Sequence, residues 1–537
     1  MNYLCSIIIA VLVTFFFVSC NKTEQSNNAE VKSKDSKIDE KIDNGVESII
    51  KSIPKLSFPD TTINLIEYAG FAPDKDGTHN FQPALNKAIR ELSASGGGTV
   101  YLTTTSNKNQ WVKETVVYRM DGPINMASNI RLLLDYSTKI QFTYKPENYL
   151  DNGKGVITRW EGVSIKSFSP LIRGFNLENV AIEAAHGNGA MPVIDGDGEK
   201  WGLWSYMQSQ DKIEGKQPYK HALHLLSDAD VKLADRERID VNKDFYRPHL
   251  IQFYLCENIL VEGVQLRDTP FWTVHFVFSE NATVRNVIFD VHNENSDGVD
   301  PESSHNVLIE NCHFNNHDDN VAIKSGRNKE GREGVDVSGT VLEGVESKFI
   351  KNNKIFGATE NVVVRNCVLK GHHAICVGSE VAGSVRNVFA VDNICVQDVI
   401  YALYIKSSPK RGGVVEDVYI RNMKINKARM ALVLNPCYAQ QDTVSSHYPL
   451  FRNIYIKDIR INEATKGAID IIGWPELPIE NVFVENLTID HIKEKEEGGN
   501  IKVRNAKNVI LKDVEIKGVL FEGDYSDESG ETPPPDV

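Results

Sequence analysis

Cysteine is scarce in this chain, with eight residues in 537. Two lie within the first twenty positions, and no pair shows the C-x-x-C spacing typical of structural zinc sites. The other six are too few to staple so long a body with disulfides. The scarcity excludes the disulfide-rich and zinc-stapled classes. We expect unpaired, buried thiols at the six body positions Cys256, Cys312, Cys367, Cys376, Cys395 and Cys437.

Positive charge is also in deficit. The chain has 59 Lys and Arg against 73 Asp and Glu, which gives a net charge of −14. Nucleic-acid binding needs clustered Lys and Arg to neutralise phosphates, so this balance argues against a nucleic-acid partner. The balance does not exclude an acidic sugar, because basic residues lining a local cleft can still bind one.

Long apolar runs are missing apart from Ile7 to Val18, which has the length of a signal-peptide core and is too short to span a membrane. The run ends at Ser19-Cys20 and resembles a bacterial lipobox, although no Lys or Arg precedes it. We therefore predict a signal peptide over 1–19, a lipid on Cys20, and a polar flexible tether over 20–55. These features indicate a lipid-anchored cell-envelope protein of the outer membrane, facing the periplasm or the surface. The alternative is an ordinary secretory signal cut nearby.

One phrase recurs from about residue 176 onward: an Asn or Asp followed by alternating apolar residues. Asn258, Asn281 and Asn306 lie 23 and 25 positions apart in this phrase. A fixed period of 20 to 30 residues with short, β-branched runs predicts a parallel β-helix, here over 56–523. The Asn suits a left-handed turn and can stack as a hydrogen-bonded ladder. Leucine-rich repeats are excluded because their LxxLxL frame is absent.

Both ends of the repeat carry distinct segments. Apolar positions of helical period predict a helix over 81–93, which ends at a run of three glycines and would cap the open end of the coil. At the other end, 524–537 is acidic and proline-rich, and we expect it to be disordered.

Three carboxylates have the spacing of a catalytic site. Asp297 and Asp318 are 21 positions apart, about one turn of such a coil, so Asp297 should lie beside Asp318 and Asp319. Like charges that close raise one another's pKa, so that one group stays protonated while another remains an ionised base. Cleavage of a glycosidic bond needs one protonated acid and one ionised base. Adjacent residues in a strand point to opposite sides, so a bend is needed to aim Asp318 and Asp319 at one cleft.

Several motifs in order resemble the polygalacturonase-type glycoside hydrolases of family 28, over about 65 to 520. The similar segments are Asn295-Ser296-Asp297-Gly298, Asp318-Asp319 followed by Ala322-Ile323-Lys324, Gly371-His372 followed by Gly378-Ser379-Glu380, and Tyr404-Ile405-Lys406 followed by Arg411-Gly412-Gly413. Each segment alone is weak evidence for the family, whereas the order and spacing of all the segments together are specific to it.

The resemblance implies a right-handed parallel β-helix and an inverting hydrolase of α-linked galacturonic acid. By position, Asp318 would be the general acid, and Asp297 and Asp319 would hold and deprotonate the water. His372 would hydrogen-bond within the carboxylate cluster and help to keep the acid protonated. Lys406 would pair with the substrate's carboxylate, with further substrate contacts from Tyr404, Lys324 and Arg327. The resemblance implies no metal or other cofactor, an acidic polysaccharide as partner, and a monomer.

The chain also departs from the family pattern. Tyr404 stands where the family has Arg, so a bidentate carboxylate clamp is missing. The insertion 327–358 would wall off one end of the cleft and suit exo-action or a decorated or algal uronide. The roles of His317 and His373 stay open. The alternatives are a polysaccharide lyase, which would give unsaturated products, and an inactive glycan-binding solenoid, which would bind without cleaving.

Overall fold

The computed structural model describes residues 28–104, 114–187, 189–210, 218–438, 447–493 and 500–530. The chain divides into two compact units, residues 1–44 and 45–537. The predicted signal peptide 1–19 and the predicted lipidation site Cys20 lie outside the described residues. No helix in the described ranges is long and apolar enough to cross a membrane.

The prediction of a flexible tether over 20–55 is wrong for its second part, where helix α1 (Asn28–Ser52) forms. Its apolar residues Ile38, Ile42, Val46 and Ile49 recur every three or four positions. This spacing places them along one stripe of a helix, a period that the polar composition of the segment concealed.

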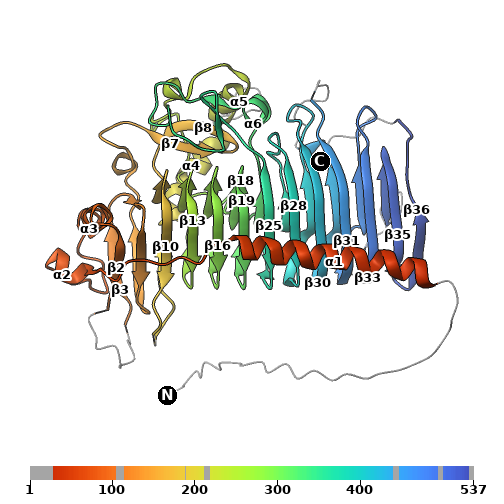
Figure 1. The fold of residues 1–537 in the computed structure, drawn as a ribbon, viewed down its shortest axis with the longest axis horizontal. Coiled ribbons are helices and arrows are strands. Elements are labelled where there is room, and N and C mark those ends of the chain that lie inside the picture. The colour runs from red at the N-terminus through yellow and green to blue at the C-terminus, as the bar shows by residue number, and fades with distance from the viewer. Residues whose placement is uncertain are drawn as a thin grey trace. The chain divides into compact units, whose positions relative to one another are not determined.

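Residues 45–537 confirm the predicted right-handed parallel β-helix, in which each coil adds a strand to each of three parallel sheets (Figure 1). The first sheet contains β1 (Thr62–Asn64), β2 (Gly98–Leu102), β5 (Ile130–Leu134), β10 (Glu178–Ala184), β13 (Glu257–Glu262), β16 (Glu280–Arg285), β19 (His305–Glu310), β25 (Thr359–Arg365) and β28 (Val385–Val391). The second contains β3 (Val116–Met120), β6 (Thr138–Phe142), β11 (Val193–Asp195), β14 (Gln265–Arg267), β17 (Ile288–Val291), β20 (His313–Asn316) and β26 (Val368–Leu369).

The third sheet positions the site described below. It contains β4 (Ile124–Asn125), β9 (Ile172–Phe175), β12 (Ile251–Tyr254), β15 (Val274–Val277), β18 (Val299–Glu302), β21 (Val321–Ile323), β27 (His373–Val377), β32 (Ile469–Ile472) and β34 (Ile501–Arg504). In the last coils the strands are long enough to run through two or three sheets without a break: β29 (Ile394–Lys406), β30 (Val414–Asn435), β31 (Leu450–Ala464), β33 (Ile479–Ile492) and β35 (Ala506–Ile516).

The recurring Asn forms the predicted ladder. Asn258, Asn281 and Asn306 adopt φ values of 57°, 56° and 55°, in the left-handed region. The Nδ2 of Asn281 donates to the Oδ1 of Asn258 at 3.0 Å, and the Nδ2 of Asn306 donates to the Oδ1 of Asn281 at 3.0 Å. Each rung therefore satisfies the amide of the next and fixes where each first-sheet strand begins.

Apolar side chains fill the interior of the coil in aligned rows. Val261, Val284, Ile309 and Val364 occupy paired positions on successive strands and are fully buried. Burying such a side chain contributes about 1.5–3 kcal/mol. All six body cysteines are buried and free, as predicted.

Both ends of the coil are covered. Helix α3 (Gln82–Ala94) confirms the predicted cap, beside the short helix α2 (Leu65–Ala69), and its residues Leu85, Ile89 and Leu92 join the core. At the other end β36 (Val519–Asp524) pairs antiparallel with β35, and Asp527 and Ala506 exchange backbone hydrogen bonds of 2.7 and 2.9 Å. The predicted disorder of 524–537 is therefore wrong for 524–530, because unpaired strand edges at the last coil bind this backbone. Residues 531–537 lie outside the described part.

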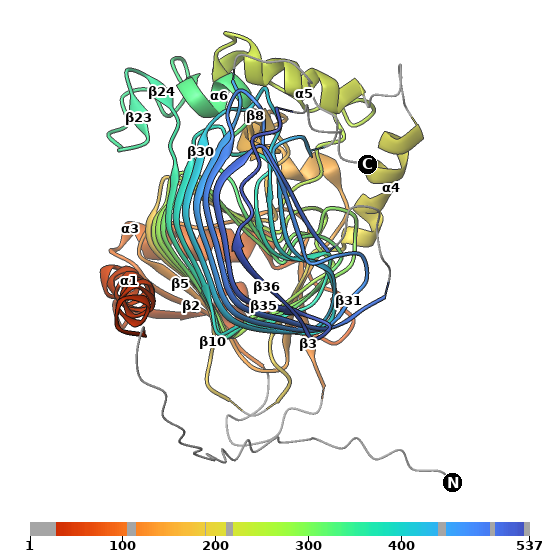
Figure 2. The ribbon, with the colours of Figure 1, turned by 90° about the vertical axis from the view of Figure 1, so that its right-hand side faces the viewer.

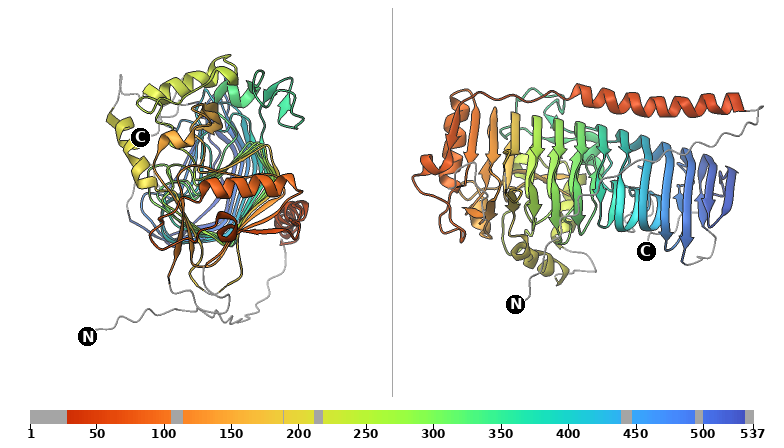
Figure 3. Two further views of the ribbon diagram at one scale, coloured as in Figure 1. Left: turned by 90° about the vertical axis from the view of Figure 1, so that its left-hand side faces the viewer. Right: turned by 90° about the horizontal axis from the view of Figure 1, so that it is seen from below.

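Several insertions gather over one edge of the third sheet (Figures 1 and 2). They comprise the hairpin β7 (Val156–Trp160) and β8 (Val163–Ser167), helices α4 (Gly198–Gln210), α5 (Pro218–Asp228) and α6 (Asn328–Glu333), the short 3₁₀ turns Pro146–Tyr149 and Leu233–Asp235, and a small sheet of β22 (Val335–Asp336), β23 (Ile350–Lys351) and β24 (Lys354–Ile355). The views along the axis show α5, α6, β23 and β24 above the stack of coils and α4 beside it (Figures 2 and 3).

Candidate active site

The carboxylates meet as the 21-residue spacing predicts. Asp297 precedes β18, and Asp318 and Asp319 precede β21, the next strand of the third sheet. The backbone N–H of Gly298 donates to the carbonyl of Asp319 at 2.9 Å, which fixes the two coils side by side. Asp318 and Asp319 lie in the bend before β21 and not in the strand, so both side chains can face the same pocket.

These residues line a pocket of about 190 Å³. Its walls combine carboxylates, cations and a few neutral groups: Glu161, Lys220, His224, Trp272, Asn295, Asp297, Asp318, Asp319, Lys324, Arg327, Ser379, Glu380, Lys406, Arg411 and Tyr438. Six of the eight predicted catalytic and substrate-binding residues are in this set. The two that are missing are His372 and Tyr404.

Asp319 is held in its ionised form. The Nδ1 of His373 bonds directly to its Oδ1, and the Nζ of Lys406 lies 3.0 Å from its Oδ2. Burial opposes ionisation, but Lys406 and His373 outweigh it and hold the pKa of Asp319 well below its usual range. Burial also lowers the pKa of His373, against the pull of Asp319. Such an ionised, oriented carboxylate is suited to accept a proton from water.

Asp297 is in a different electrostatic setting. Lys324 is its nearest cation, with Nζ 3.5 Å from Asp297, 3.5 Å from Asp300 and 3.9 Å from Glu380. One ammonium cannot neutralise three buried carboxylates. Burial and then Asp300 raise the pKa of Asp297 well above its usual range, while burial raises the pKa of Asp300 to about 8. The Asp297–Asp300 pair therefore retains a proton at neutral pH, whereas Asp319 does not.

Asp318 is the most accessible of the three acids, with its side chain 25% exposed. Its Oδ1 accepts the backbone N–H of Asp319 at 3.0 Å, and its Oδ2 accepts the Nδ2 of Asn295 at 3.4 Å. These contacts orient the carboxyl group at the open side of the pocket, where a glycosidic oxygen can reach it.

Ion pairs among the insertions close one side of the pocket. Glu161 lies in the turn between β7 and β8, and its carboxylate meets Lys220 of α5 at 3.0 Å and Arg327 at 3.6 Å. Arg327 in turn pairs with Glu380 at 2.7 Å, and Arg411 pairs with Glu380 at 3.1 Å. Arg327, the first residue of the 327–358 insertion, thus contributes to the wall, and it is the one residue of that insertion among the described residues that line the pocket. Much of the wall comes from α5 and the β7–β8 hairpin, neither of which was predicted from the sequence.

His372 lies beside Asp318, but the predicted hydrogen bond between His372 and the carboxylate cluster is not made. Its Nδ1 lies 3.7 Å from the Oδ1 of Asp318, too far for a hydrogen bond, and its side chain is 43% exposed. His373, the first residue of β27, makes the cluster contact instead, with its ring stacked on Tyr401 at 5.1 Å. Strand β27 begins at His373, and the side chain of this residue points toward Asp319.

Tyr404 is not a sugar contact. It is only 3% exposed and packs among Ala322, Cys376 and Val433 on the outer face of the third sheet. Its ring lies 5.1 Å from the Nζ of Lys406, a cation–π distance that helps to hold this lysine against Asp319. Tyr404 therefore contributes to the site indirectly, through its contact with Lys406.

The sequence reading also missed Asp300, Glu161 and Glu380 as members of the site. Asp300 stands three positions after Asp297, and Glu380 is the last residue of the Gly378-Ser379-Glu380 motif, although neither was assigned a role. No local signal marks Glu161, since only the fold brings the hairpin to the pocket. Asp319, His372 and His373 also place possible metal-ligand atoms within 4.8 Å of one another, although Lys406 already occupies one Asp319 oxygen.

Comparison with known proteins gives consistent results. Residues 234–507 match the family described as glycosyl hydrolases family 28. A probable polygalacturonase of Vitis vinifera is 26% identical over 442 residues, which cover 80% of this chain and 74% of that protein. An endo-polygalacturonase of Pectobacterium parmentieri is 25% identical over 430 residues, 78% of this chain and 85% of that protein. The crystal structure of a hyperthermoactive exopolygalacturonase from Thermotoga maritima superposes with a TM-score of 0.72 at 27% identity, covering 90% of this chain and 97% of that one.

Proposed function

This chain belongs to family 28 of the glycosyl hydrolases, and we propose that it is an exo-acting member that removes sugars from one end of a galacturonan chain. The family match spans just over half of the chain, and the protein is a glycosidase that hydrolyses galacturonan. The observation that carries the proposal is the convergence of Asp297, Asp318 and Asp319 on a pocket whose far side is closed by α5 and the β7–β8 hairpin.

The three acids have distinct roles in the proposed reaction. Asp318 protonates the leaving glycosidic oxygen, because it is the accessible acid at the open side of the pocket. Asp319 accepts the proton of the attacking water, because Lys406 and His373 keep it ionised. Asp297 orients that water. Attack on the face opposite the leaving group inverts the anomeric centre, so an α-linked substrate yields a β-configured product.

The pocket can accept an acidic sugar although the chain as a whole is acidic. Five cationic side chains line it: Lys220, Lys324, Arg327, Lys406 and Arg411. Lys220 lies on α5, outside the coil, and its side chain is 26% exposed. It is therefore the cation of the wall best placed to meet a substrate carboxylate, while Lys324 and Lys406 are committed to the catalytic acids.

The ion pairs of the wall support exo-action. Glu161 joins the hairpin to α5 and to Arg327, and α6 is tied to α5 because the Nδ2 of Asn328 donates to Asp228 at 3.2 Å. A chain entering the pocket meets this wall and cannot pass beyond it. Only a terminal sugar can then occupy the position beside Asp318 and Asp319.

A product time course tests the proposal. The purified protein is incubated with polygalacturonate and with defined oligogalacturonides, products are identified by mass, and the first-formed anomer is read by proton NMR. We expect one short product from the earliest times and β configuration at the new reducing end. The Asp319→Asn variant serves as the blank for contaminating activity. A mixed ladder of oligomers with an early fall in viscosity would contradict exo-action, and an α-configured product would contradict inversion.

The same experiment separates the other functions considered. A lyase would give unsaturated products that absorb in the near ultraviolet, and a glycan-binding solenoid would give no new reducing ends. The family assignment favours hydrolysis over both.

We further propose that Cys20 carries a lipid that anchors the protein in the outer membrane, on the strength of the apolar run and Ser19-Cys20 alone. The Cys20→Ser variant should then lose incorporation of labelled palmitate and leave the membrane fraction. Equal membrane recovery of both proteins would contradict the anchor.

A further inference from the structure

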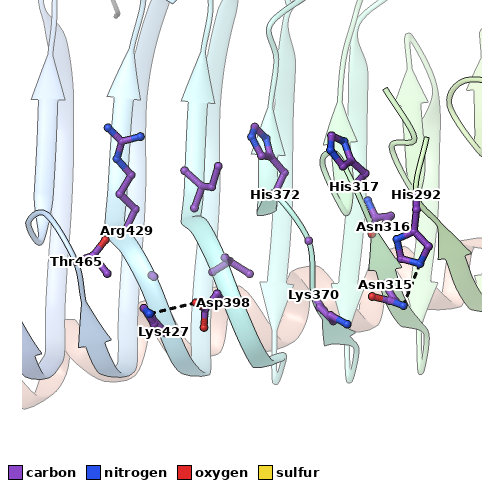
Figure 4. Close-up of a pocket in the computed structure, with 14 residues that line it drawn as sticks. His292, Asn315, Asn316, His317, Lys370, His372, Asp398, Lys427, Arg429 and Thr465 are labelled. Carbon is purple, nitrogen blue, oxygen red and sulfur yellow. Dashed lines mark hydrogen bonds and ion pairs between the residues drawn. The ribbon is translucent and has the colours of Figure 1, made fainter. Parts of the chain in front are cut away.

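A second, larger cavity lies on the other side of the catalytic acids. It has a volume of about 480 Å³ and follows the turns that join the second sheet to the third. The basic side chains of its lining are Lys370, Lys427 and Arg429, together with the histidines His292, His317 and His372 (Figure 4). We call this cavity the cationic groove. Among the described residues that line it, Asp398 is the one acid.

The groove has cations that are not neutralised by the protein. Lys427 pairs with Asp398 at 3.2 Å and with Glu463 at 3.5 Å. Within the described part of the chain, neither Lys370 nor Arg429 makes an ion pair, and the Nε of Arg429 is buried without a hydrogen-bond partner. A buried guanidinium nitrogen without a partner costs free energy unless a ligand satisfies it.

The basic side chains of the groove follow the axis of the coil. His292, His317 and His372 come from successive coils, and Arg429 comes from the coil after next. In Figure 4 the side chains of His317, His372 and Arg429 stand in one row, with Lys370 and Lys427 below them. Three steps of about 4.8 Å between neighbouring strands separate His317 from Arg429, so the row is roughly 14 Å long. A linear polyanion with one charge per sugar matches such a row better than a compact anion does.

The groove lies next to the catalytic pocket at His372. His372 lines the groove, and its Nδ1 lies 3.7 Å from Asp318, which lines the pocket. A general acid faces the leaving group, so the part of the substrate that leaves must extend from Asp318 away from the closed wall, which is toward His372.

We propose that the cationic groove binds the leaving-group side of an acidic polysaccharide, with Lys370 and Arg429 meeting carboxylates of uronate residues beyond the cleaved bond. This inference rests on the proposed function and adds to it the place and the charge of the extended substrate. It also gives His372, which lines the groove and lies beside Asp318, a role as the residue that joins the groove to the acid.

The test compares a short and a long substrate. A disaccharide of galacturonic acid spans only the cleaved bond, whereas a hexasaccharide extends into the groove. In the double variant Lys370→Ala/Arg429→Ala, kcat/KM for the hexasaccharide should fall by about 10-fold or more, because two charge-assisted contacts are lost. The value for the disaccharide should change by less than about 2-fold, since it does not reach these residues. Lys424→Ala is the matched control, because Lys424 lies on the same strand β30 but does not line the groove.

A second measurement needs no variant. Raising the salt concentration screens charges, so kcat/KM for the hexasaccharide should fall more steeply with salt than that for the disaccharide. If the double variant loses both substrates equally or neither, or if the two salt slopes coincide, the groove does not bind the leaving group. If the wild-type protein cleaves neither oligosaccharide, the proposed function itself fails, and the assignment of the groove falls with it.

Discussion

Replacing Lys406 with Met tests how the site keeps its base ionised. The Nζ of Lys406 is 3.0 Å from the Oδ2 of Asp319, and both side chains are almost fully buried. At an effective dielectric constant of about 20, two charges at this distance attract by about 5.5 kcal/mol. That figure is an upper bound for the substitution, since His373 remains on the other oxygen of Asp319. Met preserves the length and bulk of the side chain and removes only the charge.

The sign of the effect is fixed by the low pKa of Asp319. Its ionised form is the base, so activity is present above its pKa and lost as the pH falls through it. Without Lys406 the pKa rises, and the acid limb of the kcat/KM profile moves to higher pH. Near pH 6 we expect a loss of about 100-fold, within the usual range for a general base, with partial recovery as the pH is raised.

The assay is the pH profile of kcat/KM on an oligogalacturonide, with circular dichroism as a check that the variant is folded. Lys512→Met is the matched control, since the Nζ of Lys512 lies 3.0 Å from Glu485 in a pair remote from the pocket. An acid limb that stays in place after Lys406→Met would refute the reasoning. A uniform loss at every pH would equally show that Lys406 does not act through the ionisation of Asp319.

Two further predictions concern the scaffold. Asn281→Ala should lower the free energy of unfolding by about 2–4 kcal/mol, because it removes two ladder hydrogen bonds and places Ala in a left-handed turn. Asn281→Gly, which tolerates the turn, should cost less in the same denaturant titration, and equal losses would contradict the turn argument. Tyr404→Arg, which places Arg as the family pattern has it, should lower the melting temperature and not raise turnover of polygalacturonate, because Tyr404 is buried against His373. Higher turnover in that variant would restore the carboxylate-clamp interpretation.

The coil could be predicted because its signal is local and repeated. Each Asn phrase carries its own turn geometry and alternation, as Asn258, Asn281 and Asn306 show, so the period emerges from the sequence alone. The spacing between Asp297 and Asp318 then converts directly into contact between neighbouring strands. The cap α3 could be predicted for the same reason, because its apolar residues recur with a helical period and a run of three glycines marks its end.

The remaining features depend on longer-range packing. Helices α4 and α5 are inserted in the sequence between two coils. Lys220 reaches the pocket only when the hairpin, α5 and the coil pack together. Which of His372 and His373 bonds to Asp319 depends on the residue at which β27 begins. Strand boundaries are the features that a sequence predicts least reliably. Tyr404 illustrates the same limit. It points to the same side of β29 as Lys406, two positions later, and only packing against residues of other strands decides that its ring is covered.

The most direct test of the central claim uses Asp318→Asn with two substrates. One is an oligogalacturonide, whose leaving oxygen needs a proton, and the other is a nitrophenyl α-galacturonide, whose leaving group does not. If Asp318 is the acid, kcat should fall by about 100-fold or more on the first substrate and far less on the second. Asp319→Asn, which removes the base, should lose activity on both. Equal losses of the Asp318 variant on the two substrates would contradict the assignment of the acid and, with it, the account of this site.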